Sequence, residues 1–153
     1  MANRVEPRLL PPLFESLQNE QFITLATIDH ETGGPNVNAL SWVFAPDEGR
    51  ILLAVDNRSK ILHNIRNNSH VVVSIIANES TYAVSGEGSI KVESVENVPL
   101  KLAIIEINIS EVRDVMFYGS KIFLEPRYEK TYDLQAAAKL DNQVMTALKN
   151  CTE

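Results

Sequence analysis

Residues 54–75 read AVDNRSKILHNIRNNSHVVVSI, which is an apolar run, a polar cluster, a helix-like segment and a second apolar run. Apolar residues recur at helical spacing and predict a helix over 59–67, with Ser59 as its N-cap. The β-branched run that follows predicts a strand over 70–77. The triplet Arg-Ser-Lys at 58–60 therefore lies where a strand passes into a helix.

The segments on either side of this stretch are dominated by short apolar and β-branched runs separated by turn signals. The strongest turn signal is DHETGGP at 29–35, with paired glycines ahead of a proline. Gly86 and Gly88 predict a bulge or a close backbone approach in one strand. We expect strands over 22–28, 36–45, 51–55, 70–77, 81–93 and 102–112, and helices over 13–19, 59–67 and 133–148. Six strands and three helices favour a mainly β protein, an antiparallel barrel, closed or sandwich-like, with attached helices.

The amino-acid composition is that of an ordinary globular protein with more acidic than basic residues. The 153 residues are 44% hydrophobic and 22% charged, with a formal net charge of −6. Without a basic tract, binding to nucleic acid or to an anionic membrane is not expected. The single cysteine, Cys151, fits a reducing compartment, and no apolar run approaches the roughly 20 residues of a membrane span. We expect one cytoplasmic domain over 1–153, with a core at 14–115 and a helical extension at 120–150.

The Arg-Ser-Lys triplet has the chemistry of a phosphate site. A helix N-terminus carries unpaired N–H groups and partial positive charge, to which Arg58 adds a planar fork and Lys60 a mobile charge. The simpler interpretation is a solvated turn with a capping serine. The histidines at 30, 63 and 70 fall in a turn, a helix and a strand start, with no ligand-spaced cysteine or acidic pair beside them, so a metal site is not expected. We expect His63 to be an exposed helical residue rather than a neighbour of a ligand.

The order of these segments, from FITLATIDHETGGP through NVNALSWVF and DNRSK to NIRNNSHVVVSI, resembles the pyridoxamine 5′-phosphate oxidase-like FMN-binding split barrels. VSGEGSIKVES matches the Gly-centred strand of the same fold. The resemblance implies a six-stranded antiparallel split barrel of the Greek-key type that binds FMN. It also implies a homodimer whose flavins lie in the subunit interface, where Trp42, Tyr82 or Tyr118 would reach the partner's flavin. For Trp42 core filling is an equal alternative, and for the two tyrosines cross-strand packing is the stronger one.

The resemblance also implies which residues hold the cofactor. Three would bind the phosphate, a strand segment would run beside the isoalloxazine, and three residues would line the ring and the ribityl chain. In that order these are Arg58, Ser59 and Lys60; Asn38, Ala39, Leu40, Ser41 and Trp42; and Val55, Asp56 and Asn57. The resemblance identifies no catalytic side chain, because the flavin itself carries the redox chemistry.

The C-terminal sequence departs from the true pyridoxamine-phosphate oxidases. AAAKLDNQVMTALKNCTE contains no arginine and no tryptophan, although the true oxidases end in a Trp-x-Arg-Leu-type motif. Vitamin oxidase activity is therefore not expected. The sequence leaves two functions open. One is an FMN-dependent oxidoreductase of unknown substrate and electron donor. The other is a non-catalytic protein that binds flavin, haem or deazaflavin for storage or stress sensing.

Overall fold

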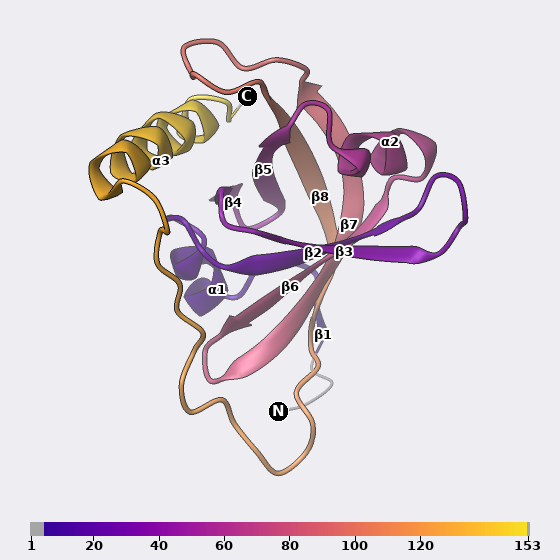
Figure 1. The fold of residues 1–153 in the computed structure, drawn as a ribbon. Coiled ribbons are helices and arrows are strands. Elements are labelled where there is room, and N and C mark those ends of the chain that lie inside the picture. The colour runs from indigo at the N-terminus through magenta and orange to yellow at the C-terminus, as the bar shows by residue number, and fades with distance from the viewer. Residues whose placement is uncertain (1–4, 153) are drawn as a thin grey trace.

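The computed structural model describes residues 5–152, which form one sheet of eight antiparallel strands with three helices around it (Figure 1). The strands run in the order β3-β2-β6-β7-β8-β5-β4, and β1 pairs with β8. The elements are β1 (Val5–Glu6), α1 (Pro11–Ser16), β2 (Ile23–Ile28), β3 (Pro35–Leu40), β4 (Val43–Asp47), β5 (Arg50–Asp56), α2 (Lys60–Asn67), β6 (His70–Ala77), β7 (Ser80–Val92), β8 (Leu102–Asp114) and α3 (Leu134–Lys149).

The expectation of six strands is wrong, because the sheet has eight and is not closed. One extra strand is β1, and the other arises where the expected strand 36–45 divides at Ser41 and Trp42. There the Val43 N–H donates to the Ser41 carbonyl at 3.0 Å, so the chain turns sharply. Before the turn it pairs with β2, and after it with β5. The two products, β3 and β4, therefore end up at opposite ends of the strand order, as in a split barrel.

The predicted close approach at Gly86 is confirmed. A Cβ atom at this position would lie 2.3 Å from the backbone oxygen of Asn108 on the neighbouring strand. The register between β7 and β8 shifts at this point, between Ser85 and Gly86. Glycine is required because a bulged strand here brings two backbones closer than any side chain allows.

Two apolar clusters lie on opposite faces of the sheet. The larger cluster, which we call the main core, includes residues of α1 and α2 and has fully buried side chains such as Leu13, Leu25 and Ile105. The smaller is covered by α3, which packs Val144 and Leu148 over β4, β5 and β8. Each cluster follows from the alternation of side chains along strands that are apolar on both faces.

Candidate functional site

The first feature of the site is the start of α2. Ser59 has extended backbone angles, and its hydroxyl accepts a hydrogen bond from the Ile61 N–H at 3.1 Å. Ser59 is therefore the N-cap, as the sequence predicts. The Ser59 N–H donates to the Asp56 carbonyl at 2.9 Å, which holds the end of β5 against the helix start. The triplet 58–60 thus lies at the positive end of an eight-residue helix.

The turn between β2 and β3 supplies a carboxylate to this helix start. Asp29 Oδ1 accepts from the N–H groups of Glu31 and Thr32 at 2.9 and 3.0 Å, and Gly33 closes the turn with a φ of 76°. The other oxygen of Asp29 pairs with the Lys60 ammonium at 2.5 Å. The Asp29 side chain is 5% exposed and that of Lys60 is 53% exposed, so the pair lies at the surface with the carboxylate inside.

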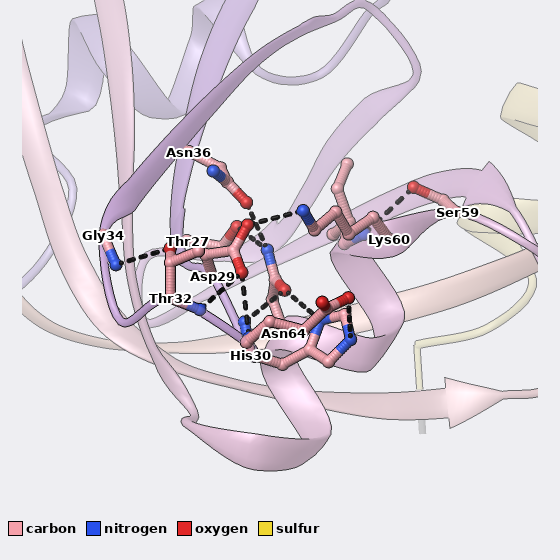
Figure 2. Close-up of polar contacts among 11 residues, drawn as sticks. Thr27, Asp29, His30, Thr32, Gly34, Asn36, Ser59, Lys60 and Asn64 are labelled. Carbon is pink, nitrogen blue, oxygen red and sulfur yellow. Dashed lines mark hydrogen bonds and ion pairs between the residues drawn. The ribbon is translucent and has the colours of Figure 1, made fainter.

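Asn64 lies beneath this ion pair and joins three elements of the fold (Figure 2). It is 1% exposed, although its neighbours on the inner face of α2 are apolar. Its Nδ2 donates to Thr27 Oγ1 and to Asn36 Oδ1, each at 2.9 Å. Its Oδ1 accepts from the backbone N–H of His30 at 2.9 Å and contacts the His30 ring nitrogen at 3.0 Å. One carboxamide therefore ties α2 to β2, to β3 and to the turn between them.

A hollow of about 380 Å³ opens between β3 and the start of α2, and we call it the β3–α2 hollow. Its wall on the strand side is residues 35–38, and its wall on the helix side includes Ser59, Lys60 and Asn64. β3 is an edge strand that pairs only with β2, and most of its side chains are exposed. Asn38, Ser59 and Lys60, which the sequence analysis selected from distant segments, thus line one hollow.

The charges around the hollow are balanced by partners within the chain. The Lys60 ammonium, together with the N–H groups of Thr32 and Glu31, holds the pKa of the Asp29 carboxyl well below its usual range. The same contact raises the pKa of Lys60. Arg58 likewise pairs with Asp56 at 3.3 Å, which lowers the pKa of that carboxyl. Lys60, which lines the hollow, and Arg58, two residues before it, are each paired with a carboxylate, so an incoming anion has to compete for both cations.

The other predicted residues of the 55–58 segment fall outside the hollow. Val55 is buried in the main core, and the Asn57 N–H donates to the Lys101 carbonyl at 2.9 Å. Arg58 is 81% exposed and does not line the hollow. The segment therefore leads from β5 into α2 and forms no wall of the hollow.

The predicted residues that come after Asn38 in the sequence lie outside the hollow. Ala39 is exposed on β3, and Leu40 packs against the main core. Trp42 packs against the cluster under α3, and its indole N–H donates to Asp141 Oδ1 at 2.8 Å. Ser41 lies beside the Tyr128 side chain, whose pKa is raised mainly by burial. Ser41 and Trp42 thus contact the C-terminal extension.

Three residues of the site had not been selected from the sequence: Asp29, Asn36 and Asn64. Asn64 could have been selected from the sequence, because it is a polar residue one turn after Ile61 on the helix face that buries Ile61 and Ile65. The structure also brings together two histidines that the sequence assigned to separate environments. The rings of His30 and His63 have centroids 5.4 Å apart. Within residues 5–152, no group of three or more potential ligands from His, Cys, Asp and Glu is placed to hold a metal ion.

The sequence profile of the Pyridoxamine 5′-phosphate oxidase family matches residues 10–116, which include every strand from β2 to β8 and the whole hollow. The chain belongs to this family. No curated protein sequence matches it significantly. Between residues 5 and 152, no helix is long and apolar enough to cross a membrane.

Several solved structures share the fold at low sequence identity. One is a candidate pyridoxamine 5′-phosphate oxidase from Lactobacillus delbrueckii, 18% identical, with a TM-score of 0.61 over 73% of this chain and 98% of that one. Another is HupZ from Group A Streptococcus, 16% identical, with a TM-score of 0.58 over 74% and 98% of the two chains. A third is the haem storage protein HutZ from Vibrio cholerae, 16% identical, with a TM-score of 0.52 over 71% and 96%.

Proposed function

We propose that this chain is a cytoplasmic FMN-binding flavoprotein that acts as an oxidoreductase on a small molecule, and that the β3–α2 hollow receives the phosphate end of the cofactor. The observation that carries the proposal is the meeting of Lys60, a capped helix N-terminus and the strand amide Asn38 around one hollow. This set suits a phosphate monoester, because backbone N–H groups, a mobile cation and neutral amides all bind its oxygens. Membership of the oxidase family supports the flavin as the group attached to that phosphate.

The residues of the hollow fit this ligand, provided that Lys60 exchanges one anion for another. Its side chain is 53% exposed and flexible, so the ammonium is free to turn from Asp29 towards the hollow. The exposed Arg58 makes the same exchange, from Asp56 to the phosphate. When bound, the flavin supplies hydride or electron transfer. The chain binds the phosphate and orients the ring along the exposed strand β3.

We also propose a homodimer in which the second copy covers this strand and completes the flavin site. β3 is an edge strand whose Val37 is 65% exposed, and an uncovered edge of this kind is costly to leave in water. A second copy would exclude water from the flavin and provide the other side of the site.

A second candidate function is non-catalytic binding of flavin or haem, for storage or stress sensing. The observation that favours it is the pair of histidines His30 and His63, whose ring centroids lie 5.4 Å apart, because imidazole nitrogen is a common ligand of haem iron. HutZ, which shares the fold, is a haem storage protein. Haem in this role would give a Soret absorbance band, and flavin would not.

The test combines a spectrum with a double variant. The freshly purified protein should show the bands of an oxidised flavin and release FMN on denaturation, and a nicotinamide or another donor should reduce the bound flavin. Arg58→Ala with Lys60→Ala should lose the flavin and keep the fold. Arg66→Ala with Lys139→Ala removes two cations outside the hollow and serves as the matched control.

A Soret band would favour the second candidate function. A double variant that keeps its full flavin content would contradict the phosphate site.

A further inference from the structure

A long segment without regular structure joins β8 to α3, and we call residues 115–133 the arm. Figure 1 shows it as an open loop that passes the β6–β7 hairpin before it returns to α3. Most of the arm lies beyond residues 10–116, which match the family. Most of its residues are exposed, but the side chain of Lys130, near its end, is only 23% exposed. The contacts of Lys130 are therefore an addition to the shared core.

The ammonium of Lys130 lies between two carboxylates from different parts of the chain. It bonds to Glu20, between α1 and β2, at 3.1 Å and to Asp141 on α3, also at 3.1 Å. All three side chains are less than a quarter exposed. Burial lowers the pKa of Lys130, but hydrogen bonds to the two carboxylates outweigh this effect and raise the pKa overall. The ammonium therefore stays charged between its two partners.

The two groups that Lys130 joins hold the corner between β3 and β4, which is residues 41 and 42. The Ser41 carbonyl accepts a hydrogen bond at 3.1 Å from the N–H of Gln21, which directly follows the first carboxylate in the sequence. The indole N–H of Trp42 donates to Asp141 Oδ1 at 2.8 Å. Lys130 therefore closes a ring of contacts in which the corner is held from both sides.

The same ammonium contacts an aromatic side chain beside the corner. It lies 5.5 Å from the centre of the Tyr128 ring, which is within the range of a cation–π interaction. That ring meets the ring of Phe22, at the start of β2, with centroids 6.5 Å apart. Because Tyr128 also lies beside Ser41, a change at position 130 reaches the corner by a second route.

Removal of the ammonium would leave Glu20 and Asp141 facing each other. Two like charges within a few ångströms repel, and each would lose the partner that offsets its partial burial. Separation of the two carboxylates would move α3 away from the start of β2. Trp42 is bonded to α3 and Ser41 to the start of β2, so this movement would open the corner between them.

We propose that Lys130 is a positioning residue, which holds the corner between β3 and β4 in place and so fixes the end of the strand along which the flavin ring is oriented. This role rests on the proposed function, in which the ring lies along β3. Lys130 does not line the β3–α2 hollow, so it has no part in binding the phosphate.

Calorimetric titration of the full-length, flavin-free protein with FMN, and separately with inorganic phosphate, tests this role. Lys130→Met should raise the Kd for FMN about tenfold and leave the Kd for inorganic phosphate unchanged. Lys130→Arg keeps a cation that can pair with both carboxylates, so it should restore FMN binding. Lys121→Met, which breaks an exposed ion pair with Glu79 in the same arm, is the matched control and should bind both ligands as the wild type does.

Amide hydrogen exchange at the corner measures the same role without any ligand. The N–H groups of Gln21 and Val43 both donate to the Ser41 carbonyl. Both should exchange several times faster in Lys130→Met than in the wild type or in Lys121→Met. The amides of β8 should keep their protection, which shows that the sheet of the variant remains folded.

Three outcomes would overturn this role. One is a Lys130→Met variant whose corner amides exchange at the wild-type rate. Another is a Kd for FMN that the substitution leaves unchanged. The third is an equal loss of FMN and inorganic phosphate, which would assign Lys130 to the phosphate site. A wild type that binds no FMN would contradict the proposed function instead, and the exchange rates alone would then decide whether Lys130 holds the corner.

Discussion

The carboxamide of Asn64 should contribute more to stability than any other polar group near the hollow, and Asn64→Ala tests this. Two of its partners, the Thr27 hydroxyl and the backbone N–H of His30, would lose their hydrogen bonds at 2.9 Å. Each group left unpaired costs about 1 to 1.5 kcal/mol. The lost volume adds about 1 kcal/mol. The free energy of unfolding should therefore fall by roughly 3 to 4 kcal/mol, which lowers the Tm by about 10 °C.

Urea unfolding followed by the fluorescence of Trp42, the only tryptophan, measures this loss. Asn67→Ala, an exposed position on the same helix, is the control and should stay within about 0.5 kcal/mol of the wild type. Asn64→Asp keeps the shape but loses both donated bonds and buries a carboxylate, so at neutral pH it should be at least as unstable as Asn64→Ala. If Asn64→Ala were no less stable than Asn67→Ala, the carboxamide would not join these elements in solution.

Two further predictions concern ion pairs. Asp29→Asn should destabilise the protein at neutral pH, because the Lys60 ammonium lowers the pKa of the Asp29 carboxyl in the folded state. That stability is present above the ordinary carboxyl pKa near 4 and is lost as the pH falls below it, so the difference between variant and wild type should shrink below about pH 4. Urea unfolding from about pH 3 to 7 measures this, and a difference independent of pH would contradict it. Asp141→Ala should cost about 1 to 2 kcal/mol and move the emission of Trp42 to longer wavelength, because the indole N–H and Lys130 both lose a partner. An unchanged emission spectrum would show that the indole does not depend on α3.

The sequence predicted the strand-rich fold and the helix cap because those depend on local patterns. Alternation and turn residues revealed most strands, and Ser59 was identified as the cap from its position before an apolar helix. The division of one expected strand into β3 and β4 was missed, because residues 36–45 contain no glycine or proline that would mark the turn at Ser41 before Pro46.

The site was harder to predict because its contacts are long-range. Asn64 meets Thr27 across 37 positions, and Trp42 meets Asp141 across 99. No pattern within a single helix or strand records such pairs. The resemblance to a family selected Asn38, Ser59 and Lys60 from distant segments, and these three residues line the same hollow. It implied a place for Trp42 beside the flavin, but it could not indicate the bond to Asp141, which lies in a segment beyond the matching residues.

The cover that α3 provides has a consequence for how this protein relates to its family. A chain that ended at residue 116 would keep every strand, yet it would present Phe44, Leu52, Leu102 and Ile104 to water. The outer face of β4, β5 and β8 therefore has to be covered by something that the shared core does not encode. In this chain the cover comes from α3, which lies wholly beyond the residues that match the family, so the matching core depends on an added helix to keep this face dry.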